Sequence, residues 1–223
     1  MQSLLRRLVV PALALAAMAF VPATGRADLV FSTSPGTLQP GENVLFDAFP
    51  DQSGTSVLGT TNQTNTTVLF TQPFEQVTLV TPSRGQARVA ASSGNFTSLQ
   101  TQLQNTSLGF TRFEANPNLA TGGERVTVRV IETNNQQTDF FFDAKASGQN
   151  FFSVEAILGQ QIRSVAIFTP SGGLMTVQDV AQIRISGIGV TAVPEASSLA
   201  LMGIVVGAGA AGGYFRKGRK GVA

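Results

Sequence analysis

The chain has no cysteine, no histidine and no tryptophan, and its single tyrosine is Tyr214. Without cysteine it forms no disulfide bonds, and without histidine it has no imidazole base. These absences exclude Ser-His-Asp and Cys-His nucleophile systems and the usual cysteine or histidine zinc sites. The chemistry that stays open is that of carboxylates and of metals with oxygen ligands, calcium more than zinc.

Charged residues make up only 13% of the chain, and the two signs are unevenly placed. Eight of the 15 lysines and arginines lie between Asp28 and Glu195, against all 13 aspartates and glutamates, so this stretch has a net charge of about −5. A nucleic-acid-binding surface needs a basic patch, and this balance argues against one. We therefore expect no nucleic-acid partner.

The first 27 residues have the features of a secretory signal peptide. Two arginines precede an apolar stretch over residues 8–21, and small residues follow it. Gly25 and Ala27 suit the −3 and −1 positions of a cleavage site before Asp28, and a cut after Ala23 also fits. The apolar stretch is short for a membrane span, which favours cleavage over an uncleaved anchor. The prediction makes signal peptidase and the secretion machinery partners of the chain.

The end of the chain carries a second hydrophobic segment. Residues 197–215 contain no charge and would be about 28 Å long as a helix, enough to cross the hydrocarbon core of a bilayer. A basic cluster over residues 216–220 follows, formed by Arg216, Lys217, Arg219 and Lys220. Because basic residues tend to stay on the cytoplasmic side, the cluster predicts a stop-transfer signal, with residues 28–192 outside the inner membrane.

Val193, Pro194, Glu195 and Ala196 stand directly before this segment. A Pro-Glu motif, a membrane helix and a basic cluster in this order resemble the PEP-CTERM sorting signal of exported bacterial proteins, here over residues 193–220. Ala196 departs from the commonest form, which has a second proline there. The resemblance implies recognition by an exosortase, a membrane-embedded transpeptidase, and then a place on the cell surface or in a polysaccharide matrix. An ordinary C-terminal membrane anchor is the alternative.

Between these ends, residues 28–192 have the composition of β structure, rich in Thr, Ser, Gln, Asn, Val and Phe. Residues 124–131 alternate polar and apolar side chains, with Val126, Val128 and Val130 on one side. Such alternation predicts strands that are buried on one face and antiparallel. The predicted fold class is all-β, an antiparallel, jelly-roll-like β-sandwich that forms one domain over residues 28–192.

The predicted strands cover residues 43–49, 66–71, 76–81, 86–91, 99–103, 107–113, 124–131, 138–144, 150–158, 163–168 and 182–188. Turns rich in glycine, proline and asparagine separate them. Asn116-Pro117 is one of these predicted turns, because Asn-Pro is a common turn signal. No segment of this region has the period of a helix.

Two pairs of acidic residues are candidates for carboxylate chemistry, Asp47 with Asp51 and Asp139 with Asp143. In a glycoside hydrolase, two carboxylates flank the sugar bond that is cleaved. Solvated or turn-capping acids are the interpretation that we favour, because the surroundings of Asp51 are typical of a turn. We therefore assign no catalytic residue.

No cofactor is expected from the sequence, but a structural calcium is a further hypothesis. Asp143, Glu155 and Asp179 lie near the ends of predicted strands, where carboxylates and carbonyls can hold calcium. The chain has no Asp-x-Asp-x-Asp loop. We therefore assign no metal site.

The densest aromatic clusters are Phe140-Phe141-Phe142 and Phe151-Phe152. In a strand, alternation puts Phe141 on the opposite side from its two neighbours. An exposed ring at Phe141 or Phe151 would be a platform for a sugar or another partner, whereas burial is the simpler interpretation. Tryptophan and tyrosine, the usual sugar platforms, are missing from residues 28–192.

The leading hypothesis for function is a non-enzymatic structural or adhesive protein of the cell surface or biofilm matrix, processed by an exosortase. It depends on the sorting signal and on the lack of catalytic residue types. One alternative is a carbohydrate-binding module for exopolysaccharide. The other is a carboxylate-dependent glycoside hydrolase or lyase.

Overall fold

The computed structural model describes residues 29–36, 38, 40–81, 85–86, 88–120, 124–146, 148–169 and 176–191. Ala27–Ala192 forms one compact unit, and all of the described residues belong to it. The predicted signal peptide (1–27) and sorting signal (193–220) lie outside the described residues. Within the described part, no helix is long and apolar enough to cross a membrane.

The described residues form sixteen strands and no helix, which confirms the prediction of an all-β domain. The strands are β1 Leu29–Ser32, β2 Glu42–Leu45, β3 Ser53–Gly54, β4 Ser56–Thr61, β5 Thr67–Thr71, β6 Leu79–Val80, β7 Arg88–Ala91, β8 Ser98–Leu103, β9 Leu108–Gly109, β10 Arg112–Leu119, β11 Glu124–Glu132, β12 Gln137–Ala144, β13 Phe152–Ala156, β14 Ile162–Phe168, β15 Val177–Ser186 and β16 Gly189–Val190.

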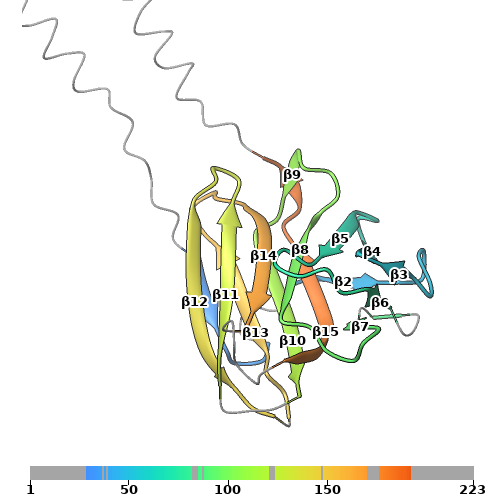
Figure 1. Ribbon diagram of the computed structural model, residues 1–223. Helices are drawn as coiled ribbons and strands as arrows, with labels where there is room; N and C mark the ends of the chain where they lie inside the picture. Colours follow the sequence, from blue (N-terminus) through green and yellow to red (C-terminus); the bar gives the residue numbers. More distant parts are fainter. Residues whose placement is uncertain are drawn as a thin grey trace, which may run out of the picture. The chain divides into compact units, whose positions relative to one another are not determined.

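The strands pair in antiparallel fashion and form two sheets that share β2. Sheet A has the order β1-β13-β10-β15-β2, and β7, β6 and β3 extend it from another part of β15. Sheet B has the order β2-β4-β5-β8-β14-β11-β12. One end of β2 pairs with β15 and the other with β4, so the sheets form a nearly closed barrel or sandwich (Figure 1). The short pair β9 and β16 stands apart from both sheets.

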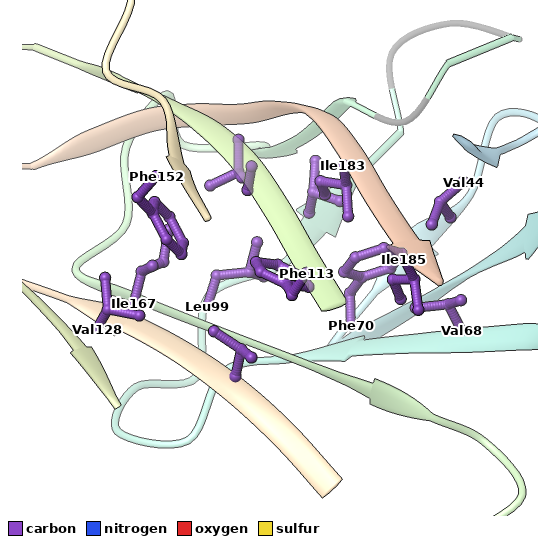
Figure 2. Close-up of a cluster of buried hydrophobic side chains, with 14 of the residues drawn as sticks. Val44, Val68, Phe70, Leu99, Phe113, Val128, Phe152, Ile167, Ile183 and Ile185 are labelled. Carbon is purple, nitrogen blue, oxygen red and sulfur yellow. The ribbon is translucent and has the colours of Figure 1, made fainter. Parts of the chain in front are cut away.

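The hydrophobic core lies between the two sheets and follows from strand alternation. Val126, Val128 and Val130 of β11 are buried, as the sequence predicts. Figure 2 shows Val128 close to Ile167 of β14 and to Phe152 of β13, which joins the two sheets in one core. Fully buried phenylalanines among the described residues are Phe46, Phe70, Phe96, Phe110, Phe113 and Phe152. Each such ring stabilises the fold by about 1.5–3 kcal/mol relative to exposure, so the core can hold the domain without disulfides.

Aromatic side chains close the barrel where its two outer strands, β1 and β12, meet. Phe31 of β1 stacks on Phe140 of β12, with ring centroids 4.8 Å apart and an angle of 4° between the planes. Phe142 continues the cluster toward Phe152, at 5.8 Å between centroids. No backbone pairing joins β1 to β12 in the described residues, so these rings hold that side together. Because Phe140 and Phe142 pack inward in this cluster, the opposite side of β12 faces the solvent.

One predicted turn is wrong. Asn116 and Pro117 lie inside β10 and not between two strands. The register of β10 with β15 shifts between Glu114 and Asn116, and such an irregularity is where a strand accepts a proline. In addition, β13 pairs only with Arg112–Ala115, so at Pro117 β10 has one partner strand instead of two. The backbone N–H that proline lacks is therefore missing at a position where only one neighbouring strand is present.

The sequence prediction also lacks β1, β3, β4 and β16, and it covers only the first two residues of β10 and the second half of β15. β1 has only four residues, and in β4 a glycine, Gly59, takes a buried position of the strand. Gly59 is needed for packing, because an added Cβ would lie 2.6 Å from Val44 Cγ1 and 3.2 Å from the ring of Phe46. A glycine in a strand that faces the core hides the alternation by which strands are recognised.

Candidate functional site

The outer side of sheet B carries the ring of Phe141. The inward valines of β11 leave Arg125 and Arg129 on the outer side, and β12 presents Asp139 and Phe141 on that same side. The register places Arg129 beside Asp139, and Thr127 lies between Phe141 and Phe168 of β14. We define face B as Arg125, Arg129, Asp139, Phe141 and Phe168.

Phe141 is half exposed, with 50% of its surface accessible to solvent. Its neighbours Phe140 and Phe142 pack against the core on the other side of the strand, as alternation predicts. The guanidinium carbon of Arg125 lies 4.8 Å from the centre of the Phe141 ring, a cation–π contact. Arg125 forms no ion pair with the described residues, so its hydrogen-bond donors stay available to a ligand.

A bidentate ion pair lies next to this ring. Arg129 donates from Nε to Asp139 Oδ1 and from Nη2 to Asp139 Oδ2, both at 2.9 Å. These hydrogen bonds hold the pKa of Asp139 below its ordinary value and raise the pKa of Arg129. The Arg129 guanidinium also lies 4.9 Å from the centre of the Phe168 ring, against which Phe74 packs edge-on at 5.5 Å. The Phe168 ring therefore helps to hold Arg129, and with it the ion pair, in place.

Small side chains lie between these larger groups. β14 presents Ala166 and Ser164 on the outer side, and both are buried by their neighbours. On the next strand Gln100 Nε2 donates to Gln102 Oε1 at 2.8 Å. Face B thus combines aromatic rings with planar polar groups and is bordered by amides. Such a surface suits a ligand that has hydroxyl groups as well as apolar C–H groups.

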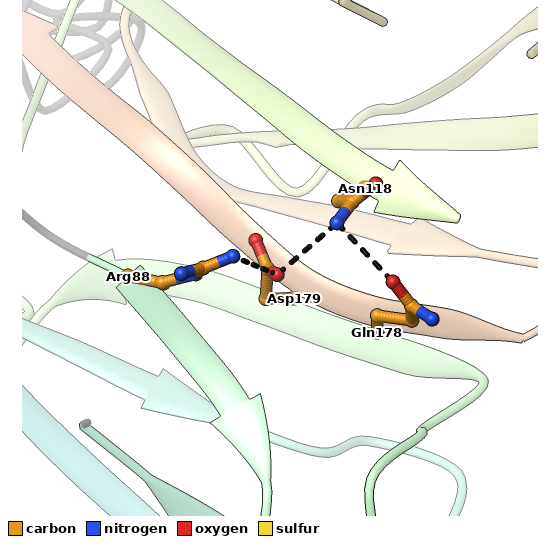
Figure 3. Close-up of polar contacts among 4 residues, drawn as sticks. All are labelled: Arg88, Asn118, Gln178 and Asp179. Atoms are coloured by element: carbon orange, nitrogen blue, oxygen red, sulfur yellow. Dashed lines mark hydrogen bonds and ion pairs between the residues drawn. The ribbon is translucent and has the colours of Figure 1, made fainter. Parts of the chain in front are cut away.

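The outer side of sheet A carries a second polar array. Asn116 Nδ2 of β10 donates to Gln182 Oε1 of β15 at 3.1 Å, and Asn118 Nδ2 donates to Gln178 Oε1 at 3.2 Å. Asn118 Nδ2 also donates to Asp179 Oδ2 at 3.4 Å, and that oxygen accepts a bond from Arg88 Nη2 at 2.7 Å (Figure 3). We define face A as the two Asn–Gln pairs, Asn116 with Gln182 and Asn118 with Gln178.

The second candidate ring, Phe151, belongs to the outer side of sheet A. It is partly buried and directly precedes Phe152, whose ring packs against Phe113 in the core. Because successive side chains of an extended chain point to opposite faces, Phe151 points away from the core. Phe141 and Phe151 therefore lie on the outer sides of different sheets, and the structure does not bring them together in one platform.

The candidate aspartates occupy three separate surroundings. Asp139 and Asp143 share the outer side of β12, but four residues of a strand separate them by about 13 Å. The two carboxylates of a glycoside hydrolase are about 5–9.5 Å apart. Asp47 Oδ1 accepts a hydrogen bond from Gly85 N at 2.9 Å, and Asp51 lies in a turn with a positive φ of 52°. The hydrogen bond of Asp47 and the backbone angle of Asp51 are typical of residues in turns.

The structure also keeps the three carboxylates of the calcium hypothesis apart. Asp179 pairs with Arg88, and Glu155 Oε1 pairs with Arg112 Nη2 at 2.6 Å. Asp143 lies on the other sheet. In the part of the chain that the structure describes, no group of three or more acidic side chains is placed to hold a metal ion.

Glu132 is a buried acidic residue that the sequence reasoning does not single out. It ends β11 and is completely buried. Asn134 Nδ2 donates to Glu132 Oε2 at 3.2 Å, whereas Oε1 has no hydrogen-bond partner among the described residues. Burial raises the pKa of Glu132, because the charged form loses its water. The alternation that turns Val126, Val128 and Val130 inward extends to position 132, and this signal identifies the residue.

No protein family matches the chain. No curated protein matches it either. Among solved structures, a family two carbohydrate esterase from Cellvibrio japonicus is 12% identical, with a TM-score of 0.28, over 75% of this chain and 37% of that chain. A family 29 carbohydrate-binding module from Piromyces equi is 12% identical, with a TM-score of 0.24, over 69% of this chain and 90% of that chain. The chain thus matches well under half the length of the esterase, and both likenesses are too distant to carry an argument about ligand or activity.

Proposed function

We propose that the chain is an exported, non-enzymatic protein of the cell surface or extracellular matrix, and that it adheres to polysaccharide through face B. The observation that carries the adhesion is the exposed ring of Phe141, with Arg125 over it and the Arg129–Asp139 pair beside it. A phenyl ring offers an apolar surface to the C–H groups of a sugar. Guanidinium and carboxylate groups offer the donors and acceptors that sugar hydroxyls need.

The non-enzymatic part of the proposal depends on residue types and spacing. The chain has neither histidine nor cysteine. Asp139 is engaged by Arg129, and it stands farther from Asp143 than the two carboxylates of a glycoside hydrolase stand from each other. These observations support binding without cleavage.

Delivery, in this proposal, depends on the two ends of the chain. The signal peptide over residues 1–27 sends the chain through the secretion machinery. The PEP-CTERM-like tail over residues 193–220 holds it at the inner membrane until an exosortase removes the tail. The domain is then left on the surface or in the matrix.

Co-sedimentation of residues 28–192 with the polysaccharide of the producing cells tests the adhesion. This segment carries all of the described strands and the described core, so we expect it to fold alone. Phe141→Ala should weaken binding roughly tenfold, which corresponds to a loss of about 1.4 kcal/mol. Arg125→Gln should weaken it as well.

Val190→Ala is the matched control, because Val190 is 76% exposed and lies on β16, away from face B. It should bind like the wild-type domain. Unchanged binding of Phe141→Ala would argue against face B as the contact surface. Release of reducing ends in the same tube would contradict the non-enzymatic role.

Fractionation of the producing cells tests the sorting. The surface fraction should contain protein that lacks the tail, whereas Pro194→Ala and Glu195→Ala should leave full-length protein in the membrane fraction. If the wild-type protein stays full length and membrane-bound in cells with an active exosortase, the sorting proposal is wrong.

A further inference from the structure

Face A contains the same arrangement, an asparagine bonded to a glutamine, at two places. Asn116 and Asn118 are two residues apart, so they point to the same side of β10, and each donates its amide to a glutamine of β15. The two Asn–Gln pairs are therefore about 7 Å apart along the strand. Gln178 is exposed, and the other three amides are partly exposed. The array is open to a ligand that lies along β10.

Each pair keeps hydrogen-bonding groups free. Within the described residues, Nε2 of Gln178, Nε2 of Gln182 and Oδ1 of Asn118 make no hydrogen bond. Amide donors and acceptors that stand side by side can bond to a hydroxyl group, which is itself both donor and acceptor. Asn118 is also held by Asp179, which is fixed in turn by Arg88 (Figure 3). The four amides carry no charge, and their hydrogen bonds orient them before a ligand binds.

The balance of charge indicates the class of ligand. On face B, Arg129 is neutralised by Asp139, and Arg125, which forms no ion pair with the described residues, has the opposite charge of Asp143 across from it in register. Face A consists of amides. The stretch from Asp28 to Glu195 has a net charge of about −5 and repels acidic polymers. Both faces therefore favour an uncharged ligand with many hydroxyl groups.

We propose that the domain is bivalent: face A and face B each bind a neutral polysaccharide chain, so that one molecule links two chains. This inference rests on the proposed function of face B and adds a second site on the other sheet. The faces lie on the outer sides of sheet A and sheet B, with the core between them, so ligands on the two faces do not compete. A domain of this kind strengthens a matrix by cross-linking its polysaccharide.

A bridging assay tests the proposal. Beads coated with a neutral polysaccharide are loaded with residues 28–192 and then offered the same polysaccharide in a soluble, fluorescent form. The probes are a glucan, a mannan and a galactan, with alginate as the acidic comparison. We expect the loaded beads to capture at least one of the neutral chains, and to capture at least tenfold less alginate.

Two variants separate the faces. Asn118→Ala/Gln178→Ala removes one amide pair of face A, and Phe141→Ala removes the ring of face B. Asn118→Ala/Gln178→Ala should keep its binding to the beads through face B, whereas Phe141→Ala should bind the beads about tenfold more weakly, as in co-sedimentation. For each bound molecule, both variants should capture at least tenfold less fluorescent chain, whereas Val190→Ala should behave like the wild type. Circular dichroism and thermal melting verify that each variant is folded.

The outcomes separate this inference from the proposed function. Binding to the beads without capture by the wild-type domain overturns bivalency and leaves adhesion through face B intact. Capture that is unchanged in Asn118→Ala/Gln178→Ala overturns the site on face A, and light scattering then shows whether a protein dimer forms the bridge. Stronger capture of alginate than of the neutral polysaccharides overturns the inference that the ligand is uncharged. Failure to bind any of the polysaccharides overturns the proposed function and bivalency with it.

Discussion

Glu132→Gln should stabilise the domain at neutral pH, and the gain should vanish in acid. Glu132 is completely buried at the end of β11, and only its Oε2 accepts a hydrogen bond, from Asn134. A buried polar atom without a partner costs about 1–3 kcal/mol, and a charged one costs more. Glutamine keeps the shape of the side chain and can accept the same bond through its oxygen. Its Nε2 then stands where Oε1 has no partner, so the substitution removes only the additional cost of the buried charge.

The pH dependence follows from the pKa of Glu132, which burial raises above the ordinary value of 4.5. Between this ordinary pKa, which applies to the unfolded chain, and the raised pKa of the folded domain, the folded state binds more protons than the unfolded state. The free energy of unfolding therefore falls as the pH rises through this interval. The cost is fully present above the raised pKa and absent below pH 4.5. The variant lacks this titration.

Thermal unfolding of residues 28–192 on both sides of this interval measures the effect. A gain of about 1–3 kcal/mol raises the melting temperature by about 2–10 °C in a domain of this size, and we expect this at neutral pH only. Glu155→Gln is the control, because Glu155 is only partly buried and is paired with Arg112, so its replacement should not stabilise the domain. A lower melting temperature of Glu132→Gln at neutral pH, or an equal rise in acid, would refute the reasoning.

Three further substitutions test the contacts around the two sheets by urea unfolding. Asp139→Asn should cost about 0.5–1 kcal/mol at neutral pH because it breaks the pair with Arg129. That pair lowers the pKa of Asp139 below 3.8, so the stabilisation is present above pH 3.8 and is lost as the pH falls through the folded value, where variant and wild type should converge. Gly59→Ala should cost about 1–3 kcal/mol, because its Cβ would lie 2.6 Å from Val44 Cγ1. Phe31→Ala should cost about 2–3 kcal/mol by removing the stacked ring between the outer strands, and should speed amide hydrogen exchange in β12. An unchanged urea midpoint in any one of them would contradict the contact that it removes.

The features that the sequence predicts correctly are those that one strand determines alone. The valines of β11 turn inward, and Phe141 turns away from Phe140 and Phe142, because the side-chain period of two belongs to the extended chain itself. The all-β class follows from the same local signal, repeated along the chain. Glu132 obeys it too, and the prediction misses this residue because a charged side chain is rarely assigned to a core position.

The features that the sequence does not predict depend on which strands meet. Pro117 is accepted inside β10 because a register shift and the end of β13 coincide there. The Asn118–Gln178 pair of face A joins residues that are 60 positions apart and needs the pairing of β10 with β15. The separation of Phe141 in β12 from Phe151, which directly precedes β13, likewise depends on the assignment of these two strands to different sheets. No local pattern contains this information.

The residues that the chain lacks bear directly on how it would hold a polysaccharide. Between Asp28 and Ala192 there is no tryptophan or tyrosine, so neither face has the large rings with polar edges that make a single sugar site strong. A phenyl ring on face B and amide pairs on face A offer modest contacts, each offset by the cost of ordering a flexible polymer. Two such contacts on one rigid domain change this balance, because once one face has bound, the other meets neighbouring chains at a high effective concentration. In a dense matrix, the proposed weak binding on both sides of the barrel would therefore give durable attachment, while each contact would stay free to open and close.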